Sequence, residues 1–260
     1  MLLPGYETIA HRGLHNKKEG IPENSLPAFQ RAVDAGVAIE LDVHLTKDGE
    51  IVVFHDDSLK RMTGFDRIVE DCTCQELIAL KLGGTEYGIP VMSRVLRLVN
   101  GRVPLLIELK DNTFSGCLAE RLMALLSDYR GTYMLQSFNP YVLYWLKKHA
   151  PRVKRGQLSQ RSFARERAGS EGVAGRLLAG PRQLARKKFL GGMLFNGLTK
   201  PDFIAYNIHD LKPEAAKKWR KDGRGLLAWT VRTEGDLRKA RWLCDGVIFE
   251  RMDLSAVKEK

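Results

Sequence analysis

The sequence has no long apolar run and few cysteines. These two absences disfavour a membrane-spanning protein and a protein held together by disulfides or zinc. A membrane-spanning helix needs about 20 consecutive apolar residues, and no such run occurs in these 260 residues. The opening stretch MLLPGYETIAHRG also lacks the basic-then-apolar order of a secretory signal. Of the four cysteines only Cys72 and Cys74 are close, without zinc-finger spacing. We therefore expect a cytoplasmic globular protein with reduced, structural thiols.

Nucleotide-binding motifs, internal repeats and Pro/Ser-rich linkers are absent too. Neither G-x-G-x-x-G after the first strand nor G-x-x-x-x-G-K-[ST] occurs, which disfavours a doubly wound dinucleotide-binding sheet. Short apolar or β-branched runs instead alternate with segments of helical period. The strands are expected at 7–11, 37–43, 103–110, 132–138, 152–158, 202–207, 225–231 and 245–250.

Helices are expected between these strands, several of them beginning at Asn, Ser, Thr or Pro. The candidates include 25–35, 115–127, 140–149, 213–222 and 234–242. Eight β-α units in about 250 residues predict an α/β fold, a (β/α)8 TIM barrel. We expect one domain over residues 1–260, with a small insertion after the second barrel strand.

Positive charge is concentrated in one segment of the chain. The net charge is +11, and residues 152–188 hold eleven Lys/Arg against two acids, or 11 − 2 = +9. One interpretation is a solvated helical face; the other is peripheral contact of residues 152–195 with an anionic membrane or phosphate-rich partner. Nucleic acid is not expected, because no aromatic-basic binding motif accompanies the charge.

Acidic side chains end two of the predicted strands. Glu40 and Asp42 are two residues apart in IELDV, so they share one face of a strand, and Glu108 and Lys110 repeat this spacing in LLIELK. Active sites of such barrels lie at the carboxyl ends of the strands. Three carboxylates converging there favour a hard divalent cation such as Mg²⁺ or Ca²⁺. The alternative is structural salt bridges with lysine and arginine.

Histidine and arginine occupy other predicted strand ends. The first strand ends in IAHRG, which brings His11 and Arg12 to the same rim with Gly13 allowing a tight turn, and His55 follows the apolar run IVVF. Imidazoles transfer protons near neutral pH, and a guanidinium holds phosphate oxygens in a fork. Together with a metal and Lys110, these groups suit phosphodiester hydrolysis.

Motifs along almost the whole chain add a resemblance. HRG, PENSLPAFQRAVDAG, IELDVHLTKDGEIVVFHDDSLKRMTG, LLIELK, QSF and LLAWTV occur in the order found in the glycerophosphodiester phosphodiesterase family, which the sequence resembles. The resemblance implies a TIM barrel with one divalent metal, Ca²⁺ or Mg²⁺. It also implies hydrolysis of small-molecule glycerophosphodiesters to an alcohol and sn-glycerol 3-phosphate.

Carried over by motif, the resemblance assigns a role to each site residue. It implies metal ligation by Glu40, Asp42 and Glu108, and acid-base catalysis by His11 as base and His55 as acid. Arg12 and Lys110 would neutralise the phosphate. Phe138 and Trp229 would form an apolar wall for the substrate. In the Pro-Glu-Asn motif, Glu23 and Asn24 would orient Arg12, cap the following helix, or both.

The chain departs from the family pattern near its end, and other functions stay open. Where the family usually closes with TDRP, this sequence has FERM, with Glu250 and Arg251, which questions substrate recognition more than catalysis. One alternative is a lysophospholipase D-like or polyglycerol-phosphate phosphodiesterase at an anionic membrane surface. The other is a binding module without activity, although all seven polar positions expected for catalysis carry competent residues.

Overall fold

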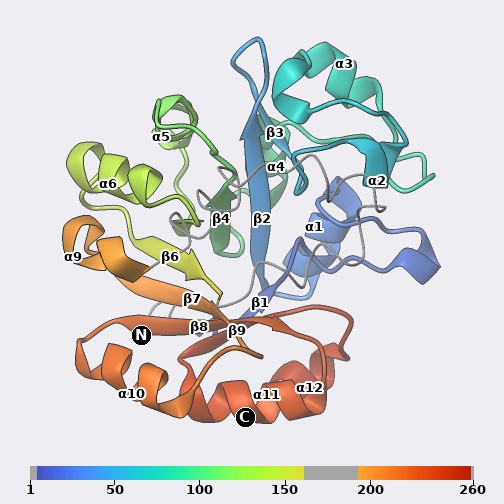
Figure 1. The fold of residues 1–260 in the computed structure, drawn as a ribbon. Helices are drawn as coiled ribbons and strands as arrows, with labels where there is room; N and C mark the ends of the chain where they lie inside the picture. Colours follow the sequence, from blue (N-terminus) through green and yellow to red (C-terminus); the bar gives the residue numbers. More distant parts are fainter. Residues whose placement is uncertain (1–4, 161–192, 259–260) are drawn as a thin grey trace, which may run out of the picture.

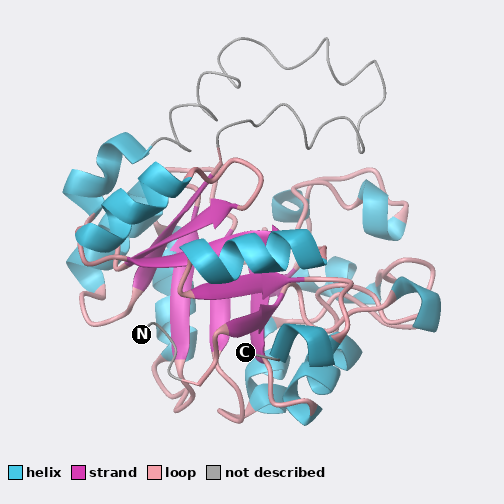
Figure 2. Cartoon of the chain, turned by 90° about the horizontal axis from the view of Figure 1, so that it is seen from below, coloured by secondary structure: helices cyan, strands magenta, loops and turns pink. Residues whose placement is uncertain are grey.

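Eight parallel strands close into a barrel in the computed structural model, which describes residues 5–160 and 193–258. In barrel order the strands are β1 (Thr8–Ala10), β2 (Ala38–Leu45), β4 (Leu105–Leu109), β5 (Tyr133–Ser137), β6 (Arg155–Ser159), β7 (Phe203–Asn207), β8 (Gly225–Val231) and β9 (Gly246–Phe249). The first strand pairs with both β2 and β9, which closes the barrel. The predicted TIM barrel is confirmed, and Figures 1 and 2 show its helices packed outside the strands.

Helices cover the outside of the barrel between successive strands. They are α1 (Leu26–Asp34), α4 (Met92–Val99), α5 (Cys117–Leu126), α6 (Pro140–His149), α9 (Asn196–Thr199), α10 (Pro213–Lys221), α11 (Glu234–Leu243) and α12 (Leu254–Lys258). Apolar residues of these helices and the outward faces of the strands form the main core. All five predicted helices are present within two residues of their expected ends.

Two local predictions need correction. The fifth barrel strand was expected over 152–158 but is Arg155–Ser159, because residues 151–154 form the turn that leaves α6. Helix α4 was not among the expected helices, although Met92, Val95, Leu96 and Val99 are buried at helical spacing. Most of the basic segment 152–195 lies outside the described residues, so its predicted membrane contact is not tested.

An insertion of residues 46–91 follows the second barrel strand, as predicted. It contains β3 (Ile51–Val53), which pairs antiparallel with β2, then α2 (Lys60–Thr63) and α3 (Cys74–Ala79). Three short 3₁₀ turns complete the described elements: η1 (Lys17–Glu19), η2 (Val69–Asp71) and η4 (Met193–Phe195). The insertion buries an apolar cluster that includes Phe54, Leu59 and Leu77. Figure 1 shows α2 and α3 on the side of α1, away from α10 to α12.

Two further observations concern the cysteines and the helices. All four cysteines are free thiols, and Cys72 is buried in the apolar cluster of the insertion. Within residues 5–160 and 193–258, no helix is both long and apolar enough to cross a membrane.

Candidate active site

The interior of the barrel changes from apolar to polar along the strands. One inward-facing layer is apolar and includes Ile9, Ala38, Leu106, Leu227 and Ile248. Because alternate side chains of a strand share a face, the residues two positions further on also point inward. That second layer includes His11, Glu40, Glu108, Gln136, Trp229 and Glu250. The polar layer therefore lies at the carboxyl ends of the strands, where barrel enzymes carry their active sites.

Three buried carboxylates meet at this end of the barrel. Asp42 of β2 lies directly opposite Glu108 of β4 in the strand register, and Glu40 is two residues before Asp42. One oxygen from each of the three lies within 4.8 Å of the others. Lys110 lies between two of them, with its Nζ 2.6 Å from Glu108 Oε1 and 3.0 Å from Asp42 Oδ1. The predicted convergence of these side chains is present in the structure.

Burial and mutual repulsion make these carboxyl groups electrostatically unequal. Burial, together with the charges of Asp42 and Glu108, raises the pKa of Glu40 well above its usual range. Burial also raises the pKa of Glu108 to about 7, against the opposing effect of Lys110. For Asp42, burial is outweighed by neighbouring cations, chiefly Lys110, and the pKa falls well below its usual range. The cluster thus carries more acidic groups than its cations compensate.

The donor set of this cluster fits a hard divalent cation. All three side chains offer oxygen, the ligand that Mg²⁺ and Ca²⁺ prefer. Two amides turn their nitrogens toward the acids: Asn24 Nδ2 donates to Asp42 Oδ2 at 2.8 Å, and Gln136 Nε2 to Glu40 Oε1 at 3.5 Å. The amide oxygens Asn24 Oδ1 and Gln136 Oε1 are buried without a hydrogen-bond partner. A cation or its water ligands would satisfy such acceptors.

His11 is held by an acid from the last strand of the barrel. Its Nδ1 lies 2.7 Å from Oε2 of Glu250, which directly follows β9. Arg232 Nε donates to Glu250 Oε1 at 2.6 Å, and His15 Nε2 lies 3.6 Å from Glu250 Oε2. Burial and Arg12 lower the pKa of His11 despite the opposing effect of Glu250. A neutral ring that donates from Nδ1 presents Nε2 as a proton acceptor.

His55 has a similar arrangement at the start of the insertion. Its Nδ1 lies 2.7 Å from Oδ1 of Asp56, and the buried His44 contacts its backbone carbonyl at 3.5 Å. Burial, with the charges of Lys110 and Arg12, lowers the pKa of His55 to about 4. His55 is therefore neutral at pH 7, with Asp56 fixing the ring tautomer.

Arg12 lies in a tight turn that directly follows β1. Its φ is +56° and that of Gly13 is +78°. A Cβ on Gly13 would lie 2.9 Å from the backbone carbon of Ala28 in α1, so only glycine fits there. The Arg12 amide donates to Glu40 Oε2 at 3.1 Å, and its Nη1 to Glu23 Oε1 at 2.6 Å. The backbone of the turn is therefore hydrogen-bonded to the carboxylate cluster, and the guanidinium Nε lies 3.6 Å from Asp42 Oδ2.

The two residues of the Pro-Glu-Asn motif have separate contacts. Glu23 accepts a hydrogen bond from Arg12 and orients it, which was one of the predicted roles. The positive charges of Arg12 and Arg61 outweigh the effect of burial and lower the pKa of Glu23 to about 2. The predicted helix cap is wrong, because Ser25 is the N-cap of α1. Asn24 instead donates to Asp42, within the carboxylate cluster.

Phe138 and Trp229 meet at the rim, as the sequence predicted. Their rings lie edge to face, with centroids 5.7 Å apart and an interplanar angle of 86°. Phe138 follows β5 and Trp229 lies on β8. The two rings form an apolar contact at the rim and pack against the apolar layer of the barrel interior.

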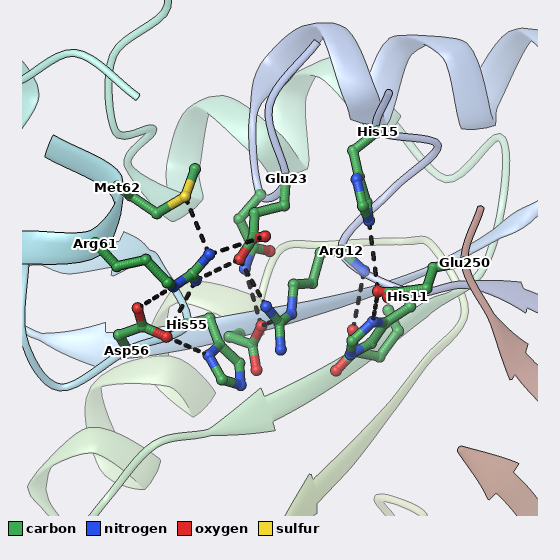
Figure 3. A network of polar contacts seen from close by, with 12 residues as sticks. His11, Arg12, His15, Glu23, His55, Asp56, Arg61, Met62 and Glu250 are labelled. Carbon is green, nitrogen blue, oxygen red and sulfur yellow. Dashed lines mark hydrogen bonds and ion pairs between the residues drawn. The ribbon is translucent and has the colours of Figure 1, made fainter. Parts of the chain in front are cut away.

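Four polar residues at the site had no predicted role. Gln136 and Glu250 lie on the inward face of strands that were themselves predicted, so strand alternation was a usable signal for both. Asp56 follows His55 directly in the sequence. Arg61 lies in α2 of the insertion, and no sequence periodicity indicates its contact with the rim. Figure 3 shows Arg61 between Glu23 and Asp56.

Comparisons with known proteins show the family of this chain. Residues 11–254 match the model of the "glycerophosphoryl diester phosphodiesterase family". A glycerophosphodiester phosphodiesterase of Caldanaerobacter subterraneus subsp. tengcongensis is 31% identical over 257 residues, which cover 92% of each chain.

Solved structures give the same result for the fold. A glycerophosphodiester phosphodiesterase of Thermotoga maritima has a TM-score of 0.68 and 26% identity, covering 94% of each chain. A phosphodiesterase of Oleispira antarctica, solved in complex with the product sn-glycerol 3-phosphate, has a TM-score of 0.73 at 22% identity. It covers 95% of this chain and 93% of its own, and supports the fold alone. By its match over residues 11–254, the chain belongs to the glycerophosphoryl diester phosphodiesterase family, a family of phosphoric diester hydrolases.

Proposed function

We propose that this enzyme hydrolyses glycerophosphodiesters to an alcohol and sn-glycerol 3-phosphate, using a divalent metal ion and two histidines. The main support for this proposal is a cluster of polar side chains at one end of the barrel. It contains His11, Arg12 and the buried carboxylates Glu40, Asp42 and Glu108. Family membership supports the reaction class. The arrangement gathers carboxylate oxygens, a guanidinium and imidazoles, which supports the proposed cation binding, phosphate binding and proton transfer.

The three carboxylates are the proposed metal ligands. Glu40, Asp42 and Glu108 would hold Mg²⁺ or Ca²⁺, which would act as a Lewis acid toward the phosphate oxygens. Arg12 and Lys110 are proposed to neutralise the remaining charge of the phosphodiester. Phe138 and Trp229 are proposed to pack against the glycerol or its alcohol substituent.

The two imidazoles are proposed to move the protons of the reaction. His11 accepts a proton from the attacking oxygen at Nε2, and the carboxylate of Glu250 stabilises the imidazolium that forms. His55, protonated when the substrate binds, donates its proton to the leaving alkoxide. The negative charge of a bound phosphodiester raises the pKa of a nearby imidazole, which allows His55 to be protonated for this step.

Two measurements on matched variants test these roles. The first is release of glycerol 3-phosphate from choline, ethanolamine and glycerol diesters with Mg²⁺, Ca²⁺ or a chelator. The second is metal binding by calorimetry. We expect Glu40→Gln to lose metal binding and turnover together, and His11→Ala to keep the metal and lose turnover.

The outcomes separate the parts of the proposal. Metal-loaded, fully active Glu40→Gln protein would contradict the ligand assignment. Turnover that a chelator leaves unchanged would contradict metal dependence. Failure on every soluble diester, with metal bound and the fold intact, would contradict the proposed substrate class. The membrane contact of residues 152–195 and the single domain over residues 1–260 stay predictions.

A further inference from the structure

Arg61 of the insertion binds two carboxylates that belong to different parts of the site. Its Nη2 and Nη1 lie 2.7 and 3.2 Å from the oxygens of Glu23. Its Nε and Nη2 lie 2.5 and 3.1 Å from the oxygens of Asp56. Figure 3 shows the guanidinium between the two acids. This fork geometry fixes both acids relative to one another.

Each of these carboxylates holds one group of the proposed reaction. Glu23 accepts from Arg12 at 2.6 Å, and Asp56 accepts from His55 at 2.7 Å. Arg12 comes from the turn after β1, whereas His55 follows β3. A continuous chain of contacts thus runs from the phosphate-binding guanidinium through Glu23, Arg61 and Asp56 to the imidazole.

The environment distinguishes this network from an ordinary surface ion pair. Exposed pairs contribute little because solvent screens them. The Arg61 side chain is 38% exposed, but those of Glu23 and Asp56 are 14% and 23% exposed. Water solvates these two carboxylates less than exposed ones, so their charged forms depend more on a paired cation. Arg61 contacts both of them at once.

We propose that Arg61 is a positioning residue that sets the relative placement of Arg12 and His55. The consequence for catalysis rests on the function proposed above. Lysine cannot replace it, because a single ammonium group lacks the planar fork that grips two carboxylates. The insertion would then contribute to the reaction through a side chain that contacts neither the metal ligands nor the substrate.

Arg67 provides a matched control within the same insertion. Its side chain is 37% exposed and binds Glu76 at 3.0 Å and the carbonyl of Asp71 at 2.6 Å. These partners lie within the insertion and hold no residue of the proposed reaction. Arg67→Ala therefore reports what loss of a comparable arginine does to the insertion itself.

The kinetic experiment compares Arg61→Ala, Arg61→Lys and Arg67→Ala on glycerophosphocholine at saturating metal. We expect both Arg61 variants to lose on the order of 10- to 100-fold in kcat, as misplaced catalytic groups do. KM and calorimetric metal affinity should change little. Arg67→Ala should keep the wild-type kcat. Added guanidinium ion should restore part of the activity of Arg61→Ala, since the site is open to solvent.

Nitrogen NMR of the His55 ring tests the placement without turnover. We expect the Nδ1-protonated tautomer in the wild type and in Arg67→Ala, and a mixture of tautomers in Arg61→Ala. A wild-type enzyme without turnover would contradict the proposed function, while the spectra would still decide the role of Arg61. Unchanged kcat and unchanged spectra in Arg61→Ala would overturn the inference. An equal loss of kcat in Arg67→Ala would overturn it as well.

Discussion

Replacing Gly13 by alanine should destabilise the fold and disturb the site. Two costs contribute to the loss of stability: an unfavourable backbone conformation and a steric clash. The new Cβ would lie 2.9 Å from the Ala28 backbone carbon and 3.0 Å from its oxygen, with a φ of +78°. The left-handed conformation costs a non-glycine residue about 1 kcal/mol. Forcing a methyl group against the backbone of α1 adds about 2 kcal/mol.

Gly20 isolates the first of these two costs. It lies in the same loop with a φ of +68°, but a Cβ there meets nothing within 4 Å. We therefore expect Gly20→Ala to lose about 1 kcal/mol and Gly13→Ala about 3 kcal/mol of unfolding free energy. For a chain of this size the larger loss corresponds to a fall in Tm of roughly 6–12 °C.

Urea and thermal unfolding measure the two losses, and diester turnover measures the effect on Arg12. Gly13 is the neighbour of Arg12, so its substitution should reduce kcat in protein that is still folded at the assay temperature. Gly20→Ala should retain turnover. Equal destabilisation by the two substitutions would refute the steric argument, because both share the same backbone conformation.

Three further predictions concern the ionisable groups. Mg²⁺ or Ca²⁺ at 100 times its Kd should raise the unfolding free energy by about 3 kcal/mol, and calorimetry should record this as a higher Tm. The Glu40→Gln variant should show no such rise in Tm when the metal is added. Glu23, whose pKa is lowered to about 2, stabilises the fold above its unfolded pKa of about 4.5 and loses that contribution as pH falls toward 2. Urea unfolding between pH 5 and 2 should therefore show a steeper loss in the wild type than in Glu23→Gln. In Glu250→Gln the new amide can donate to His11 Nδ1 and so move the ring proton to Nε2. The kcat should then fall on the order of 100-fold, because Nε2 can no longer accept a proton. A wild-type kcat would contradict the assignment of the His11 ring proton to Nδ1.

The sequence predicted the barrel and most of the site because both depend on local patterns. Alternation along single strands placed Glu40, Asp42 and Glu108 on one inward face, and the eight β-α units brought those faces together. The strand boundary at 152–158 was wrong where residues 151–154 form a turn. The position of such a boundary depends on a few residues, and their preference for extended structure alone does not show that the chain turns there.

Two of the contacts that the sequence did not predict join distant segments. Arg61 and Glu23 are 38 positions apart, and His11 and Glu250 are 239 apart. Glu250 belongs to the FERM stretch that departs from the family pattern, and that departure bears directly on His11 rather than on substrate recognition alone. Only the barrel closure between β1 and β9 brings these two residues together.

The contact between His11 and Glu250 has a consequence for the order in which the enzyme matures on the ribosome. The histidine directly follows the first strand of the barrel, but its acidic partner follows the last strand. Contacts so distant in sequence form late, because a long loop must first be closed. A nascent chain that still lacks β9 therefore carries nearly all of the site while His11 remains unoriented. In the proposed reaction, proton transfer by His11 would become available only when synthesis of the barrel is almost complete.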